Sequence, residues 1–193
     1  MSATPSTMKE LGTPAPDFAL PDTAGAIVSK NDFAGSPLLV AFICNHCPYV
    51  SQNGHQLGGQ TAAYAARGRG VVLISSNDIA THPEDAPSEM PAFIREFGIS
   101  VPYLFDESQE VAKAYEAACT PDFFLFDSGH TLVYRGQFDG ARPGNDQPIT
   151  GADLSAAVDA ILNGEPPLTD QQPSMGCNIK WKPGNEPAFF TVG

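Results

Sequence analysis

The chain has few basic residues for its size. Ten lysines and arginines stand against 22 aspartates and glutamates, which gives a formal net charge of -12. A surface of this sign repels phosphate-rich polymers, because binding to them depends on clustered positive charge. We therefore expect no nucleic-acid partner.

Long apolar runs are also missing. No stretch of the sequence approaches the length of a membrane span. The segment from Met1 to Glu10 has no apolar core of the kind found in signal peptides. These absences predict a cytoplasmic protein with no membrane partner.

Cysteine is scarce, with four residues in a chain of 193. Small secreted proteins held together by disulfides have a far higher density of cysteine. These four are therefore expected to be catalytic, metal-binding or inert in a reducing compartment. With 42% hydrophobic residues, the chain is long enough to form one domain with a complete core.

Strand-like and helix-like segments alternate along the chain, which predicts an α/β sandwich. The apolar segments 38–43 and 71–75 are expected to be buried strands. Gly54, Gly58 and Gly59 weaken the prediction of a helix where they occur. The other expected elements are an N-terminal hairpin (16–20 with 26–29), helices over 50–66, 92–97 and 107–118, a strand over 102–105, a hairpin (122–126 with 131–134), and a last helix from a capping box at 150–153 to residue 162.

Cys47 is the strongest candidate for a reactive residue. It follows the first buried strand and precedes Pro48, and proline is typical of the first position of a helix. The free N–H groups of a first helical turn stabilise a thiolate, and a protonated His46 would add to this effect. A lone cysteine is often only a small buried hydrophobic residue, but the loop residues around Cys47 favour a redox thiol.

Several short motifs resemble the redoxin or alkyl-hydroperoxide-reductase/thiol-specific-antioxidant group of the thioredoxin-like superfamily, in its peroxiredoxin-like branch. They are Ala15-Pro-Asp-Phe-Ala-Leu-Pro-Asp22, Asn45-His-Cys-Pro-Tyr-Val50, Cys119-Thr-Pro-Asp-Phe-Phe-Leu-Phe-Asp127, Tyr134-Arg-Gly136 and Gly176-Cys-Asn-Ile-Lys-Trp-Lys182. The resemblance implies a thioredoxin-like fold, in which helices flank a central mixed sheet. We expect a flexible leader over 1–13, a domain over 14–164 that begins with a β-hairpin, and a C-terminal extension over 165–193 that packs on the domain.

The resemblance also implies roles for individual residues. Thioredoxins have a strand phenylalanine five positions before the attacking cysteine, and Phe42 stands at that spacing from Cys47. Val50 occupies the place of their second cysteine, so the usual resolving thiol is missing. Pro121 matches the cis-proline that lies against the active cysteine and offers backbone groups to an extended substrate. Peroxiredoxins have Thr or Ser three residues before their cysteine, where this chain has Cys44, so disulfide exchange is favoured over peroxide reduction.

Three other cysteines are candidates to resolve a disulfide on Cys47. Cys44 forms a C-x-x-C with Cys47, Cys119 lies two residues before the expected cis-proline, and Cys177 lies in a tail long enough to fold back. Each of them is equally interpretable as a structural thiol. Cys119 is narrowly favoured because it adjoins Pro121.

We therefore expect a thiol-dependent oxidoreductase without a cofactor, whose partners are protein or small-molecule disulfides and thiols, with peroxides as a further substrate class. Two alternatives stay open. A metal site is suggested by the N and S donors of Cys44, His46, Cys47 and His55. A non-catalytic binding protein on a thioredoxin fold is suggested by the missing second thiol.

Two other features of the sequence have simpler interpretations. The acidic residues Asp78, Glu84, Asp85 and Glu89 are interpreted as a solvated stretch of a loop. Trp181 is expected to be an apolar anchor for the tail.

Overall fold

The computed structural model describes residues 3–190. Its main sheet has five strands in the order β6-β5-β4-β8-β9. The parallel strands are β4 (Leu38–Phe42), β5 (Gly70–Ser75) and β6 (Tyr103–Phe105). Strand β8 (Asp122–Phe126) runs antiparallel to β4, and β9 (Leu132–Gly136) runs antiparallel to β8. This is the mixed sheet that the resemblance implies.

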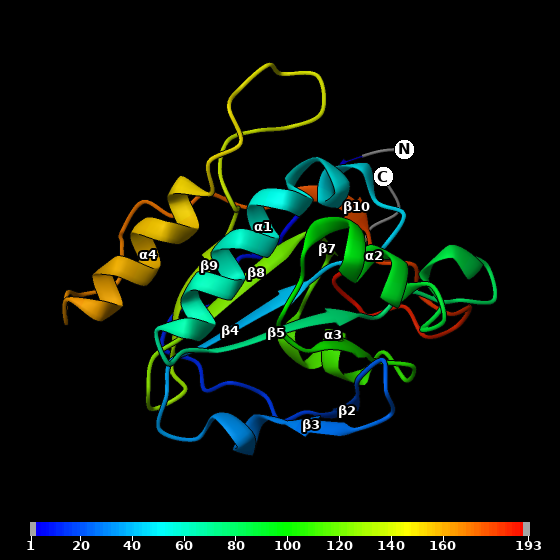
Figure 1. Cartoon of the computed structure of the whole chain (residues 1–193), viewed down its shortest axis with the longest axis horizontal. Helices are drawn as coiled ribbons and strands as arrows, with labels where there is room; N and C mark the ends of the chain where they lie inside the picture. The colour runs from blue at the N-terminus through cyan, green and yellow to red at the C-terminus, as the bar shows by residue number, and fades with distance from the viewer. Residues whose placement is uncertain (1–2, 191–193) are drawn as a thin grey trace.

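Helices cover both faces of the main sheet (Figure 1). Helices α1 (Pro48–Ala66), α2 (Met90–Phe97) and α4 (Ala152–Leu162) pack on one face. The other face is covered by α3 (Glu110–Tyr115) and by the expected hairpin of β2 (Ala19–Pro21) and β3 (Ile27–Ser29). Because β4 and β5 are covered on both faces, nearly every residue in them is apolar.

A second, three-stranded sheet lies beside the end of β4 and has the order β1-β10-β7. Its strands are β1 (Ala3–Pro5), β10 (Met175–Asn178) and β7 (Cys119–Thr120), and both pairings are antiparallel. This sheet joins the two ends of the chain to the segment that precedes Pro121.

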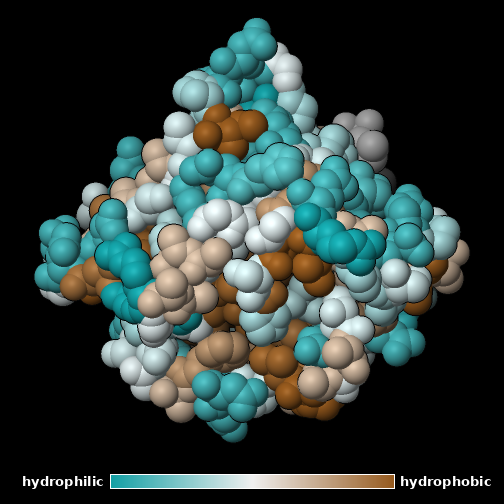
Figure 2. Space-filling view, viewed as in Figure 1, coloured by the Kyte–Doolittle hydropathy of each residue, from teal (hydrophilic) through white to brown (hydrophobic). Residues whose placement is uncertain are grey.

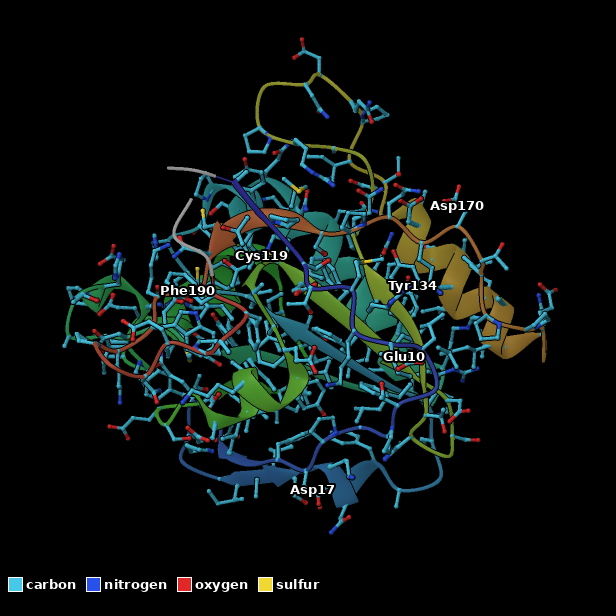
Figure 3. The ribbon with its side chains drawn as sticks, turned by 180° about the vertical axis from the view of Figure 1, so that it is seen from behind. Glu10, Asp17, Cys119, Tyr134, Asp170 and Phe190 are labelled. Carbon is cyan, nitrogen blue, oxygen red and sulfur yellow. The ribbon has the colours of Figure 1, made fainter. Side chains whose placement is uncertain are left out.

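The N-terminal segment lies against the domain, and this corrects the expected flexible leader over 1–13. Strand β1 pairs with β10, and further along the segment Lys9 forms an ion pair of 2.6 Å with Glu116. The segment then crosses the back of the molecule past Glu10 (Figure 3). Residues 1–2 of the expected leader fall outside the described part of the chain.

The C-terminal extension packs on the domain as far as residue 190. Ile179 and Trp181 are buried against the face of the sheet that α3 covers. The backbone of Lys180 also bonds to the main domain, because its N–H donates to the Asn77 side chain and its carbonyl accepts from the Asp78 N–H. The segment that follows β10 is therefore held in place.

Two predicted boundaries are wrong. Helix α3 is shorter than the expected 107–118, because Gln109 and Glu116 adopt left-handed conformations at its ends, with φ of 65° and 57°. The N-cap residue of α4 is Gly151, also left-handed with φ of 63°, rather than Thr150. The Thr150 hydroxyl still accepts the Ala152 N–H at 3.3 Å, but the Gly151 N–H donates to the distant Asp139 carboxylate at 2.7 Å, so only part of the expected capping box forms.

On the face seen in Figure 2, hydrophilic residues lie mainly at the rim, and several apolar patches lie between polar residues nearer the centre. Within residues 3–190, no helix combines the length and the apolarity that crossing a membrane requires.

Short 3-10 turns, η1 (Lys30–Phe33) and η2 (Pro83–Asp85), complete the described elements.

Candidate functional site

Cys47 lies at the junction that the sequence predicts. It is the N-cap residue of α1, Pro48 is the first helical residue, and the Cys47 carbonyl accepts the Val50 and Ser51 N–H groups. Its sulfur therefore lies near the positive end of a long helix, which favours a thiolate. The Cys47 side chain is 0% exposed, so the site is covered in this structure.

Three cysteine side chains meet at this point. The Cys177 and Cys44 side chains lie close enough to the Cys47 sulfur for both thiols to lower its pKa. When protonated, Cys47 donates to the Thr120 carbonyl at 3.2 Å, and the Cys44 sulfur lies 3.4 Å from the Thr120 hydroxyl. Two of the three candidate resolving residues, Cys44 and Cys177, are thus in contact with the candidate nucleophile.

The neighbouring thiols decide which member of the cluster ionises most readily. Cys177 makes the largest contribution and Cys44 the next in holding the pKa of Cys47 far below that of an ordinary thiol, and these contributions outweigh the opposing effect of burial. Cys47 in turn raises the pKa of Cys177 and of Cys44, and burial raises both further. Cys47 is therefore the thiol of the cluster that ionises most readily.

Pro121 lies beside this cluster, and the Thr120–Pro121 peptide bond is cis, as expected. Thr120 faces Cys177 across the pairing of β7 with β10. Successive side chains of a strand point to opposite faces, so Cys119 points away from the face where Thr120 and Cys177 meet Cys47. The Cys119 sulfur instead lies 3.7 Å from the Pro121 carbonyl.

Cys119 is consequently less well placed to resolve a disulfide than the sequence suggests. No described hydrogen bond joins its sulfur to that of Cys47. Burial raises the pKa of Cys119, and the neighbouring Asp122 carboxyl raises it further. In the rear view of Figure 3, Cys119 lies close to β10, whose Asn178 pairs with it.

The loop before Cys47 is organised by Asp85, which corrects its interpretation as part of a solvated acidic stretch. Asp85 is fully buried and accepts the Asn45 N–H at 2.8 Å, the His46 N–H at 3.2 Å, and the Asn77 amide at 2.8 Å. Its carboxylate also lies 2.6 Å from His46 Nδ1. Asp78 is likewise buried, whereas Glu84 and Glu89 are exposed.

His46 is paired with Asp85 rather than with Cys47. The hydrogen bond to Asp85 raises the pKa of His46 above its ordinary 6.5. Burial alone would raise the pKa of Asp85, but hydrogen bonds from His46 and Asn77 bring it below its ordinary 3.8. Since Asp85 balances the charge of His46, the Cys47 thiolate depends on the thiols and the helix and not on the imidazole, contrary to expectation.

The geometry changes the set of residues that a metal would meet. Cys44, His46 and Asp85 have ligand atoms within 4.8 Å of one another, whereas His55 packs edge-on against Phe97 with ring centroids 5.1 Å apart. Two residues of the metal hypothesis formed from the sequence, Cys47 and His55, therefore lie outside this group. Asp85 already accepts four hydrogen bonds, which explains its position without an ion.

Two residues of the site were missed by sequence reasoning. Asp85 lies 38 positions after Cys47 in a loop whose acidic neighbours look alike. Thr120 was noted only as the partner of Pro121, although its backbone and hydroxyl contact two of the cysteines. The Thr-Pro motif was an available signal for Thr120, while no local signal identified Asp85.

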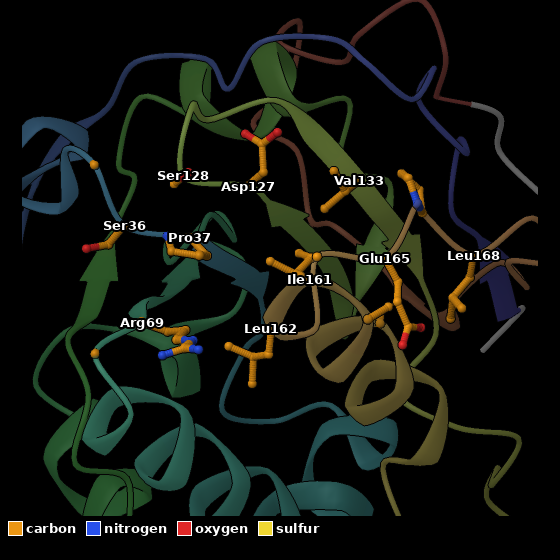
Figure 4. Close-up of a pocket in the computed structure, with 16 residues that line it drawn as sticks. Ser36, Pro37, Arg69, Asp127, Ser128, Val133, Ile161, Leu162, Glu165 and Leu168 are labelled. Carbon is orange, nitrogen blue, oxygen red and sulfur yellow. The ribbon is translucent and has the colours of Figure 1, made fainter.

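A cavity lies elsewhere in the molecule (Figure 4). It has a volume of about 540 Å³, and Pro37, Arg69, Asp127 and Leu162 are among the residues that line it. Pro37 and Arg69 immediately precede β4 and β5, whereas Cys47 follows the opposite end of β4. This cavity is therefore separate from the thiol cluster.

Comparisons with known proteins agree with this geometry. A family model described as the AhpC/TSA family matches residues 11–135, which include Cys47 and Pro121 but not Cys177. The thiol-disulfide oxidoreductase ResA of Bacillus subtilis is 24% identical over 124 residues, which cover 63% of this chain and 64% of that protein. The chain thus spans slightly less than two thirds of the length of this relative.

Solved structures share the fold. A hypothetical protein from Sinorhizobium meliloti is 51% identical with a TM-score of 0.91, over 94% of this chain and 100% of that one. An uncharacterized conserved protein from Geobacillus kaustophilus is 47% identical with a TM-score of 0.92, over 95% and 98%. A thiol:disulfide interchange protein of the thioredoxin family from Chlorobium tepidum is 19% identical with a TM-score of 0.61, over 80% and 99%.

Proposed function

Because the chain belongs to the AhpC/TSA family, we propose that it is a thiol-dependent oxidoreductase that exchanges disulfides through Cys47. One observation carries the proposal: the Cys47 sulfur lies at the N-terminus of α1, 3.2 Å from the carbonyl of Thr120, the residue before the cis Pro121. A stabilised thiolate is the nucleophile in thiol-disulfide exchange. The similarity to ResA supports the same chemistry.

The reaction follows from the thiolate. Cys47 attacks one sulfur of a substrate disulfide, the disulfide breaks, and the second sulfur leaves as a thiolate that takes a proton from water. The substrate sulfur that stays is held in a mixed disulfide with Cys47. A second thiol must then release it, and the substrate has gained two electrons when both of its sulfurs have left.

Disulfides fit this site better than peroxides. Cys44 occupies the position three residues before Cys47, where peroxiredoxins have a hydroxyl. Among residues 3–190, no cationic side chain hydrogen bonds to the Cys47 sulfur to stabilise a departing oxygen. Peptide and protein disulfides are therefore the proposed substrates.

The test measures the pKa of Cys47 and whether disulfide reduction requires this residue. In protein labelled with ¹³C at the cysteine Cβ, the Cys47 signal should titrate well below the ordinary thiol pKa of about 8.5. The same protein should accelerate reduction of insulin by dithiothreitol, C47S should reduce the rate to that without protein, and C119A serves as a matched control that should keep the acceleration. A pKa of Cys47 at or above the ordinary value, or full activity of C47S, would contradict the proposal.

A further inference from the structure

Strand β10 covers the reactive sulfur. It pairs with β7 through only two residue pairs, Cys177 with Thr120 and Asn178 with Cys119. The Thr120 carbonyl lies 3.2 Å from the Cys47 sulfur, so the residue opposite Thr120 is placed directly against Cys47. Cys177 is itself only 2% exposed, and a bulky disulfide cannot reach Cys47 while β10 stays in place.

Without β10, the short strand β7 would be an open edge beside a thiolate. An unpaired edge binds an extended polypeptide by adding it as another strand. A polypeptide that paired with Thr120 in the register of β10 would place one side chain where Cys177 now lies. A cysteine at that position would have its sulfur at Cys47.

The backbones of β10 and β7 are so close together at Gly176 that a single added methyl group would separate the two strands. A Cβ atom added to Gly176 would lie 2.0 Å from the Thr120 carbonyl oxygen and 2.7 Å from the Thr120 carbonyl carbon. Both are backbone atoms, so a side chain at this position would force β10 away from β7. Gly176 therefore lets the two backbones approach as closely as they do.

The segments around β10 limit how far it moves. On the N-terminal side, the Ser174 N–H bonds to the Ser6 hydroxyl, and β1 pairs along the outer edge of β10. On the C-terminal side, Trp181 is buried in the core. Displacement of β10 together with β1 breaks the two pairs with β7 but leaves Trp181 in place, so the strand can return to the same register.

We infer that β10 is an internal strap occupying the substrate edge of β7: it yields this edge to an incoming polypeptide disulfide, and on its return Cys177 resolves the mixed disulfide on Cys47. The inference rests on the proposed function and adds the resolving residue and the gate. It also explains why Val50 can stand where a second active-site cysteine is otherwise expected.

After Cys47 has formed the mixed disulfide and the first substrate thiol has left, β10 pairs again with the edge of β7. Cys177 loses its proton to water and attacks the Cys47 sulfur, the mixed disulfide breaks, and the second substrate thiol leaves with a proton. The substrate is reduced by two electrons, the protein holds a Cys47–Cys177 disulfide, and an external thiol reductant restores both thiols.

The surroundings favour Cys177 over Cys44 for this role. Cys47 and burial raise the pKa of both cysteines; Lys180 lowers that of Cys177 and Thr120 lowers that of Cys44, so the choice between them rests on their positions in the fold. Cys44 also lies next to the well-anchored loop of Asn45 and His46, where it cannot withdraw to admit a substrate. Cys177 is on the segment that must move.

The first test follows the fate of a mixed disulfide. The reduced protein is mixed with a disulfide-linked peptide, and mass spectrometry maps the cysteines over time. Wild type should pass to a Cys47–Cys177 disulfide, while C177S should keep the peptide on Cys47 at least about tenfold longer, because an intramolecular thiol acts at millimolar effective concentration. The matched variants C44S and C119S should resolve the adduct.

Equal adduct lifetimes in wild type and C177S would overturn the inference while leaving the proposed function intact. Trapping in C44S with normal resolution in C177S would assign the role to Cys44 and overturn it as well. Failure of every variant to form an adduct on Cys47 would instead contradict the proposed function.

The second test concerns the strap. G176A should form the Cys47 adduct several times faster than wild type, because β10 no longer fits against β7. G59A is the matched control, because a Cβ at Gly59 meets no atom within 4 Å, and its rate should equal that of wild type. An unchanged rate in folded G176A would overturn the strap.

Hydrogen exchange in wild type gives the same information if G176A does not fold. The amides of β10 should exchange much faster than those of β4, and formation of the Cys47–Cys177 disulfide should slow them. Equally slow exchange in β10 and β4 of the reduced protein would overturn the inference.

Discussion

At the scale of single residues, Asp85 shows how a buried charge can position a reactive loop. Its carboxylate accepts the N–H groups of Asn45 and His46, the two residues that precede Cys47, and it pairs with the His46 ring. A charge without water is stable only when such donors surround it. The approach of the chain to Cys47 therefore depends on a residue from the distant turn η2.

Replacing Asp85 with Asn should destabilise the protein, because the new amide N–H would face groups that also donate. We expect the free energy of unfolding to fall by about 1–3 kcal/mol. The pKa of His46 is raised in the folded protein, so its contribution is present below pH 6.5 and is lost as the pH rises through the folded value. Asp85 has a lowered pKa, so its contribution is lost as the pH falls below 3.8.

The cost of D85N should consequently be larger at pH 5.5 than at pH 8, as measured by urea unfolding. E84Q changes the exposed neighbouring acid and is the matched control, with an expected effect within about 0.5 kcal/mol. A D85N cost that did not depend on pH would contradict the pairing of Asp85 with His46.

Sequence reasoning at this scale identified residues whose chemistry depends on local position. Cys47 was found because it follows a predicted strand after a short loop and immediately precedes a proline, and Pro121 was found from a resemblance in a short motif. The contact of Cys177 with Cys47 joins positions 130 residues apart and depends on the path of the C-terminal extension. No local pattern encodes that path.

At the scale of elements, the packing of α1 against α2 explains why α1 contains glycine at positions 54 and 58. A Cβ at Gly58 would lie 2.1 Å from the Phe97 carbonyl oxygen, and one at Gly54 would lie 2.3 Å from the Phe97 ring. These two glycines let α2 approach α1 closely, whereas Gly59 is exposed and open. The helix is continuous because its packing against α2 offsets the low helix propensity of glycine.

The pair Gly58 and Gly59 gives an internal comparison. G58A should lower the free energy of unfolding by about 1–3 kcal/mol, because α2 must shift to admit the methyl group. G59A should raise it by about 0.5–1 kcal/mol, because alanine is the better helix former at an open site. Urea unfolding of both variants measures the difference, and equal effects would contradict the close contact between α1 and α2.

Elements with strong patterns were predicted better than their ends. The strands β4 and β5 follow from uninterrupted apolar runs, and the hairpin of β8 and β9 follows from its turn. The ends of α3 and the start of α4 were wrong because they depend on left-handed residues and on Asp139, and neither feature is evident from local propensity.

At the scale of the whole molecule, the two chain ends close over one side of the domain. Strands β1, β10 and β7 are far apart in sequence but form one sheet. Packing of the C-terminal extension was expected from its apolar residues, whereas the pairing of β1 was not, because three residues carry too little pattern. Long-range pairing of this kind depends on the completed fold.

Asp122 lies next to this sheet, two residues after the end of β7. We expect its ionisation to influence how the free energy of unfolding changes with pH. Asp122 follows Pro121, is 0% exposed, and neither carboxylate oxygen has a hydrogen bond of good geometry among the described residues. Burial raises the pKa of Asp122 to about 8, and weak contacts with the Ala118 N–H and the Ser174 hydroxyl offset only part of this effect. The folded protein therefore favours the protonated carboxyl far more than the unfolded chain does.

A group that holds its proton more tightly in the folded state favours folding less as the pH rises. The contribution of Asp122 should fall between pH 4 and pH 8, with a slope of at most about 1.4 kcal/mol per pH unit. In D122N this slope should disappear, because the amide does not titrate in this range. Unfolding by urea from pH 5 to pH 8 measures both proteins, and an equal pH dependence in wild type and D122N would show that Asp122 is already ionised in the folded molecule.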